Sequence, residues 1–204
     1  EHHNHNDVGS FVIASDGVPV VVDVGRPTYT RQTFGPDRYD IWTMQSAWHN
    51  TPVIGGRQQN PGPAYRARDV TVDIDGATVE WSADLAGAYP DGSASSWRRH
   101  VSFVDGRVRV ADEWRSDVGA AHRWHLVLAG SVDVDDSGAR ARVVPLEGAA
   151  SVVVRWPVGV RSTLSRRDLE DPLLTDVWGT SLYRLELDIS HRRDVVVTFE
   201  TLPP

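Results

Sequence analysis

The sequence of 204 residues predicts an all-β protein, an antiparallel, multi-stranded β-sandwich with few or no helices. Two observations lead to this fold class. Short runs rich in β-branched residues recur along the chain, and several alternate apolar with polar residues, as residues 184–189 do. In addition, no longer window combines a 3.6-residue apolar period with helix caps, although residues 39–47 also fit a short helical turn.

Three Asp-Gly pairs predict tight hairpin turns, because both residue types tolerate the left-handed backbone of two-residue loops. Asp16-Gly17 joins runs at 11–14 and 18–23, Asp75-Gly76 joins 70–74 and 77–81, and Asp105-Gly106 joins 101–104 and 107–111. Further strands are expected at 123–128, 141–144, 151–156, 182–189 and 194–199. Residues 58–63, which are polar and rich in Pro and Gly, are expected to form a loop within one domain.

The composition excludes several classes of function. The net charge is -7, and all 21 basic residues are Arg against 28 acidic residues, which argues against general nucleic-acid binding. The chain has no Cys, so disulfides, thiol catalysis and Cys-based metal sites are excluded. No apolar run approaches the roughly 20 residues that span a bilayer. The composition leaves the cellular compartment open.

The segment His3-Asn4-His5-Asn6-Asp7 is the first candidate for chemistry. On a strand, residues 3, 5 and 7 would point to one face, where two imidazoles and a carboxylate suit a divalent metal. The alternatives are a purification tag or a solvated polar end. A tag is normally an uninterrupted run of His, whereas these residues alternate with Asn.

Asp23 and His49 are the second and third candidates. Asp23 lies within an apolar run, where a carboxylate is costly unless it is paired, hydrogen-bonded or bound to metal; the alternative is a turn with Gly25. His49 follows Trp48, and its alternative is a packed, hydrogen-bonded histidine. Together His5, Asp23 and His49 offer three ligands for zinc and leave a fourth position open, although other triples fit the sequence too.

These motifs and the pair Arg38-Tyr39 resemble the C-terminal β-sandwich of the heparinase II/III-like polysaccharide lyases. The order H-x-H-x-D-x-G-x-F, D-x-G, R-Y and S-x-x-H-N-T follows residues 3–51, and from residue 60 onward the likeness is that of a generic β-sandwich. The resemblance implies that His3 is the catalytic histidine beside the bound sugar. It implies that His5, Asp23 and His49 hold a structural zinc.

Two further roles follow from the same resemblance. Tyr39 matches a position near the active site that some alginate-cleaving relatives use for proton transfer. Arg38 would bind a substrate carboxylate, for which a planar guanidinium is well suited. The implied reaction is β-elimination at a uronic acid, where a base such as His3 removes the proton at C5 and an acid protonates the departing O4.

The resemblance also predicts how the chain is organised. Residues 1–204 would form one C-terminal domain excised from a larger enzyme, whose N-terminal α/α toroid supplies another Tyr and the Asn or His that neutralises the uronate. The expected partners are therefore that toroid and an acidic polysaccharide, of glycosaminoglycan or alginate type. We expect the isolated chain to bind zinc and to have little or no lyase activity. The particular polymer, the cleavage mode and the oligomeric state stay open.

Alternative readings remain. A non-catalytic, metal-stabilised structural or carbohydrate-binding module fits the same residues. A metallo-β-lactamase fold would need a final His where Val8 stands, and a cupin would need a Glu near Gly9 and Ser10. The basic runs 98–100, 166–167 and 191–193 fit solvated strand edges or contacts with an acidic polysaccharide. Five tryptophans fit either the core or sugar stacking: Trp97, Trp114, Trp124, Trp156 and Trp178.

Overall fold

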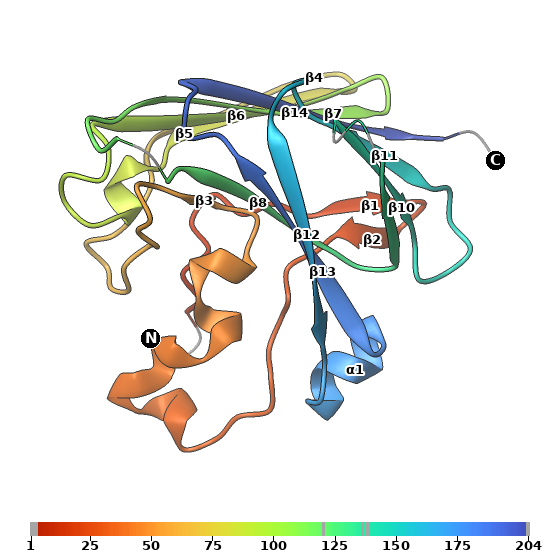
Figure 1. Cartoon of the computed structure of the whole chain (residues 1–204), viewed down its shortest axis with the longest axis horizontal. Helices are drawn as coiled ribbons and strands as arrows, with labels where there is room; N and C mark the ends of the chain where they lie inside the picture. Colours follow the sequence, from red (N-terminus) through yellow and green to blue (C-terminus); the bar gives the residue numbers. More distant parts are fainter. Residues whose placement is uncertain (1–3, 120, 136, 138, 203–204) are drawn as a thin grey trace.

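The computed structural model describes residues 4–119, 121–135, 137 and 139–202, which fold into two stacked antiparallel sheets (Figure 1). The smaller sheet has six strands: β1 (Ile13–Ser15), β2 (Val18–Val21), β3 (Pro52–Val53), β8 (Arg123–Leu128), β12 (Arg161–Asp168) and β13 (Ser181–Asp188). Its order is β1-β2-β8-β13-β12, with β3 paired to β8. The predicted all-β sandwich is therefore confirmed.

The larger sheet has eight strands in the order β4-β5-β6-β7-β14-β11-β10-β9. Its strands are β4 (Arg68–Asp75), β5 (Thr78–Asp84), β6 (Ser96–Val104), β7 (Arg107–Arg115), β9 (Ser131–Val134), β10 (Arg140–Val144), β11 (Val152–Arg155) and β14 (Asp194–Thr201). Side chains from the facing surfaces of the two sheets meet in one core cluster that includes Trp97, Trp124, Leu185 and Phe199. Four of the five tryptophans named above are buried, and Trp178 is half-buried.

The hairpin predictions hold at two of the three turns. Asp16-Gly17 and Asp105-Gly106 are two-residue loops in which both residues have positive φ, as a type I′ turn requires. The prediction for Asp75-Gly76 was wrong by one residue. Asp75 pairs with Thr78, so the loop is Gly76-Ala77, and Gly76 alone supplies the positive φ.

A third layer covers part of the outer face of the six-stranded sheet, below the two sheets in Figure 1. It contains four short 3₁₀ turns, at Gln32–Phe34, Pro36–Asp40, Trp42–Met44 and Ser46–Trp48, and the helix α1 (Pro172–Trp178). Trp48 and Leu174 from this layer pack with Val127 and Leu182 of the sheet in a second apolar cluster. The helical turn expected at residues 39–47 is thus a series of 3₁₀ turns.

Several elements differ from the sequence-based expectation. Strands β3, β9 and β12 and helix α1 were not predicted, and the chain from residue 4 to residue 12 is not a strand. A last 3₁₀ turn, Ala86–Ala88, precedes β6. Among the described residues, no helix combines the length and the apolar character needed to cross a membrane.

Candidate functional site

Three of the predicted site residues converge on one point. His5, Asp23 and His49 each place one potential ligand atom within 4.8 Å of the other two. The three come from separate parts of the chain: the segment before β1, the segment after β2, and the end of the 3₁₀ turn Ser46–Trp48. We call this cluster the candidate metal centre. Its donor set, two imidazoles and a carboxylate, is a common one for zinc with three protein ligands.

The contacts of His49 show how this centre suits a cation. Its Nε2 lies 3.0 Å from the carbonyl oxygen of Thr43, and its Nδ1 lies 2.9 Å from Oδ2 of Asp23. A carbonyl oxygen only accepts hydrogen bonds, so Nε2 carries the proton. Nδ1 then faces a carboxylate either as a second N–H or as a lone pair that shares a cation with Asp23. Metal-binding histidines typically have this arrangement, with the other ring nitrogen donating to a carbonyl.

Burial and neighbouring charges shift the pKa values of the other two groups. Burial, followed by the nearby His49, lowers the pKa of His5, which favours the neutral ring that can ligate a metal. Burial acts to raise the pKa of Asp23, but the hydrogen bond and charge of His49 outweigh it, so this pKa lies below its ordinary value. Both shifts favour the protonation states that bind a metal ion.

Both interpretations of Asp23, as a paired carboxylate and as part of a turn with Gly25, agree with the structure. Its Oδ1 accepts a hydrogen bond of 2.9 Å from the backbone N–H of Gly25, which closes the turn that the sequence suggested. Its Oδ2 faces His49 at the candidate metal centre. One carboxylate oxygen therefore fixes the local backbone while the other is turned toward the cluster.

Residues 5 and 7 do not lie on a strand, so the condition under which residues 3, 5 and 7 would share one face is not met in the described part. Gly9 has φ +82°, and Ser10 donates its backbone N–H to the Asp7 carbonyl, so the segment turns instead of alternating. Asp7 is not part of the cluster found among the described residues, and His3 lies outside those residues. The role predicted for His3 therefore stays a prediction.

Contacts from later parts of the chain hold the segment that carries His5. The backbone N–H of Asn6 donates to the carbonyl of Met44, and its side chain donates to the carbonyl of Gln59. The amide side chain of Gln59 in turn pairs with both the N–H and the carbonyl of Val8. The loop predicted at residues 58–63 thus packs against the segment beside the candidate metal centre.

Arg38 is buried, with 5% of its surface exposed. Its Nη2 donates to the carbonyl of Asn4 at 2.9 Å and its Nη1 to the carbonyl of Thr33 at 2.8 Å. Since Asn4 precedes His5 directly, Arg38 fixes the backbone next to His5. Tyr39 is half-buried beside it, with the guanidinium 6.0 Å from the centre of the tyrosine ring. The substrate roles predicted for both residues stay predictions.

Arg99 does not lie on the surface, although residues 98–100 were interpreted as a solvated strand edge or a contact with an acidic polysaccharide. Its side chain is fully buried and forms a two-pronged ion pair with Asp112, with both contacts at 2.8 Å. The sequence contains a signal for this pair. The turn at Asp105-Gly106 sets the register of the hairpin β6–β7, and that register places Arg99 opposite Asp112 on the inward face.

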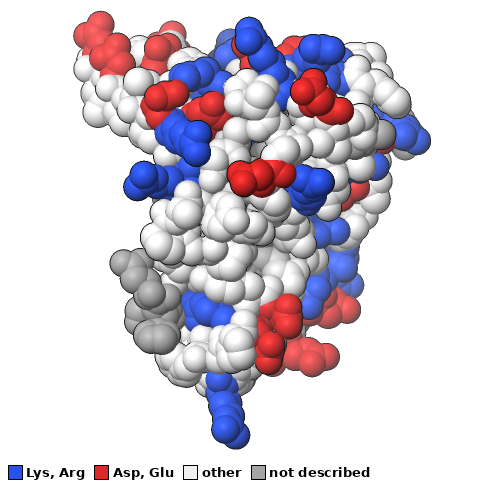
Figure 2. All heavy atoms as spheres, turned by 90° about the vertical axis from the view of Figure 1, so that its left-hand side faces the viewer, with Lys and Arg blue, Asp and Glu red and all other residues white. Residues whose placement is uncertain are grey.

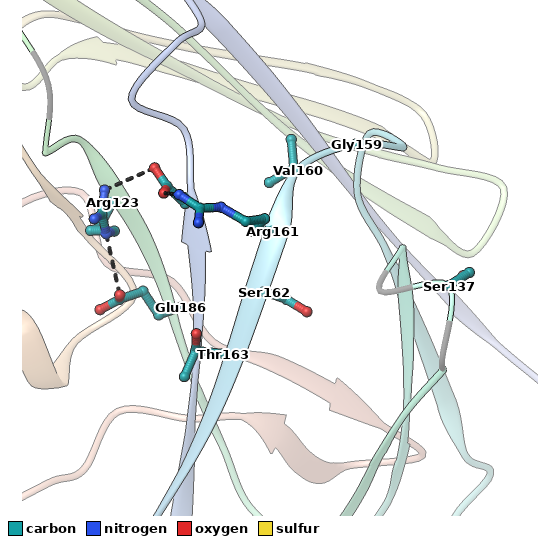
Figure 3. Close-up of a pocket in the computed structure, with 9 residues that line it drawn as sticks. Arg123, Ser137, Gly159, Val160, Arg161, Ser162, Thr163 and Glu186 are labelled. Carbon is teal, nitrogen blue, oxygen red and sulfur yellow. Dashed lines mark hydrogen bonds and ion pairs between the residues drawn. The ribbon is translucent and has the colours of Figure 1, made fainter.

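A polar hollow of about 540 Å³ is lined mainly by residues of β8, β12 and β13 and by none of the candidate metal centre (Figure 3). Its charged groups pair with one another. Arg123 contacts Asp188 at 2.9 Å and Glu186 at 3.3 Å, and Arg161 contacts Asp188 at 2.6 Å. Because each carboxylate here has an arginine partner, the hollow does not present an uncompensated charge to a ligand.

The side of the molecule shown in Figure 2 mixes acidic and basic side chains. Over the part of this face that the structure describes, no broad field of one sign stands out. This face therefore presents no broad basic surface for a long polyanion.

Comparison with known proteins identifies the family. The family described as heparinase II/III-like, C-terminal, matches residues 1–171. The chain belongs to this family. Three solved structures of heparinase III share its fold: a crystal structure at 17% identity and a TM-score of 0.72, and two of another heparinase III, one with methylated lysines, both at 13% identity with TM-scores of 0.71 and 0.70. A comparison with curated protein sequences gave no match.

The structural match covers nearly all of this chain but a minority of each heparinase III. It includes 98%, 98% and 97% of the present chain and 30% of each of the three heparinase III chains. At these identities the likeness establishes the fold. The heparinase II/III-like C-terminal sandwich predicted from residues 3–51 is therefore confirmed as the family of the chain.

Proposed function

We propose that this chain is the zinc-binding β-sandwich domain of a polysaccharide lyase that cleaves uronic-acid-containing polymers by β-elimination. The observation that carries the proposal is the convergence of His5, Asp23 and His49 within 4.8 Å, in a chain of the heparinase II/III-like family. Zinc bound by these residues would act as a structural cross-link between three segments of the chain. The polymers in question are of the glycosaminoglycan or alginate type.

Other residues of this chain would take part in the catalytic steps. His3 would remove the C5 proton, since an imidazole has a pKa near neutral pH. The guanidinium of Arg38 donates to the carbonyl of Asn4, the residue that follows His3 in the sequence. Tyr39 would lie near the departing oxygen. Metal-bound His5 would keep the His3 backbone within reach of the sugar.

The uronate carboxylate must also be neutralised as charge develops on it. Near the candidate metal centre, the guanidinium of Arg38 is turned toward the carbonyls of Asn4 and Thr33. We therefore propose that an α/α toroid domain supplies the neutralising group and a second Tyr. The coverage of only 30% of each heparinase III chain supports this division of labour.

The test is an assay for unsaturated uronate, followed by ultraviolet absorbance, on a panel of glycosaminoglycans and alginate. We expect little or no product from the 204-residue chain alone, and product from at least one polymer when a separately produced toroid domain of the same protein is added. His3→Ala is expected to abolish that product. Cleavage by the chain alone would contradict the proposed division, and failure of the mixture on every polymer would contradict the lyase assignment.

A further inference from the structure

A buried polar network lies within the main core cluster and is hydrogen-bonded to the segments that carry the candidate metal centre. At its base, Asp112 accepts four hydrogen bonds: two from the Arg99 guanidinium and one from each of the indole N–H groups of Trp97 and Trp124. Arg99 and Asp112 are both almost completely buried. An ion pair in such a place is costly in desolvation and is weak evidence for a role in stability alone.

The remaining contacts of Arg99 leave its own hairpin. Its Nη1 donates to the carbonyl of Gly9 at 2.7 Å and to the carbonyl of Asn50 at 2.6 Å. Gly9 lies four residues after His5, and Asn50 follows His49 directly. One guanidinium group therefore joins the two segments that carry the histidines of the centre.

Asn50 extends the network to the third segment. Its side-chain Nδ2 donates to the carbonyl of Val22, the residue before Asp23, at 2.9 Å and to the carbonyl of Phe11 at 2.7 Å. Its Oδ1 accepts the backbone N–H of Val127 in β8 at 2.7 Å. All three segments that carry a ligand are thus hydrogen-bonded to Arg99 or to its partner Asn50.

We propose that Arg99 is a positioning residue for the candidate metal centre. Through Asn50, and with Asp112 behind it, its guanidinium fixes the spacing of the three ligand-bearing segments without touching the ligands. The inference rests on the proposed metal site. It explains why a charged pair occupies the core: a planar group with five donors can bind a carboxylate on one side and two carbonyls on the other.

The test compares Arg99→Lys with a control of similar burial, Val154→Ala in β11, both in the 204-residue chain. A lysine keeps the charge beside Asp112 but cannot bridge both carbonyls. Cobalt(II) serves as the probe, because its visible spectrum reports the geometry of its ligands. We expect Arg99→Lys to weaken cobalt binding about tenfold or more and to alter the spectrum. We expect Val154→Ala to lower the melting temperature while it keeps the wild-type spectrum and an affinity within about twofold of wild type.

Hydrogen exchange without metal separates this inference from the metal proposal. In Arg99→Lys, the amides of Asn50 and Val127 are expected to exchange faster, while those of Val152–Arg155 keep their protection. Wild-type cobalt affinity and spectrum in Arg99→Lys, or equal losses in Val154→Ala, would overturn the inference. Failure of the wild-type chain to bind cobalt would count against the metal site, and the exchange pattern would then decide the role of Arg99 by itself.

Discussion

His49 lies between Thr43 and Asp23, with its Nε2 3.0 Å from the threonine carbonyl and its Nδ1 2.9 Å from the aspartate Oδ2. The ring is fully buried, so its orientation is fixed by the protein and not by solvent. Since the Thr43 carbonyl assigns a proton to Nε2, Nδ1 is the ring nitrogen that is directed at the carboxylate. This relationship is the structural basis of the proposed metal centre.

Gly9 is predicted to be intolerant of any side chain. A Cβ at Gly9 would lie 2.6 Å from a methyl carbon of the fully buried Leu85, and the residue has φ +82°. We expect Gly9→Ala to lower the free energy of unfolding by about 2–4 kcal/mol, through backbone strain and overpacking together. Chemical denaturation measures this loss.

Gly17 provides the matched control for Gly9. It has nearly the same φ, +83°, but a Cβ there meets nothing within 4 Å. Gly17→Ala should therefore cost only the backbone term, about 1 kcal/mol. Equal losses in the two variants would show that the approach of Leu85 to Gly9 does not constrain the segment.

We predict that Arg38 stabilises the backbone at Asn4, next to His5, in addition to the substrate-binding role expected from the sequence. Arg38→Met leaves the carbonyls of Asn4 and Thr33 without their donors, so we expect a loss of about 2 kcal/mol in the free energy of unfolding. The exposed Arg31 is the control, and Arg31→Met should change stability by less than about 0.5 kcal/mol. Unchanged stability in Arg38→Met would contradict the supporting role.

Asp188 is predicted to stabilise the edge of the six-stranded sheet. Partial burial acts to raise its pKa, but hydrogen bonds from Ser190 and the charges of Arg123 and Arg161 lower that pKa to about 2. Because the folded pKa lies below its ordinary value of 3.8, the stabilisation is complete above about pH 4 and is lost as the pH falls toward 2.

Asp188→Asn should therefore reduce the free energy of unfolding by about 1–2 kcal/mol at pH 7, and the difference from wild type should shrink near pH 2. Asp168→Asn removes an exposed ion pair with Arg166 of the same strand, β12, and should have little effect at either pH. A loss in Asp188→Asn that is independent of pH would contradict the assigned pKa.

His125 is predicted to make stability depend on pH in the neutral range. Its ring is buried in the sheet, where burial outweighs the hydrogen bond to Glu186 and lowers its pKa below 6.5. As the pH falls below 6.5, the unfolded chain binds a proton that the folded chain resists, so stability is lost toward acid. With a chelator present, His125→Gln should flatten this slope, and His191→Gln, at an exposed position, should not.

The sequence predicted most accurately what short-range chemistry determines. The turns at Asp16-Gly17 and Asp105-Gly106 follow from residues that accept positive φ. The family resemblance grouped His5, Asp23 and His49, and the structure brings these three side chains together, while their role as zinc ligands stays a prediction. The polar edge strand β12 has no strong apolar alternation, which explains why it was missed. Helix α1 has only seven residues, and its signals are local: an Asp171 N-cap, Pro172 at the first position and Gly179 after the end.

Contacts between distant parts of the chain account for the other differences. A strand at residues 3–7 was considered only as a condition for a shared face, and hydrogen bonds from Asn6 to Met44 and between Val8 and Gln59 impose a different path on the described part. Arg99 was read with its neighbours as a surface run, although strand alternation turns it inward between two exposed or half-exposed residues. For the first segment the partners lie far away in sequence, where local pattern carries little information. For Arg99 the register of the β6–β7 hairpin, and not the run of basic residues, identifies the partner Asp112.

The most direct test of the account is the zinc content of the chain purified without a nickel column, measured beside His49→Ala and the exposed control His191→Ala. We expect about one zinc per chain in the wild type and in His191→Ala, and none in His49→Ala. A wild-type chain that unfolds cooperatively but contains no zinc, or a His49→Ala variant that retains it, would contradict a metal centre built from His5, Asp23 and His49.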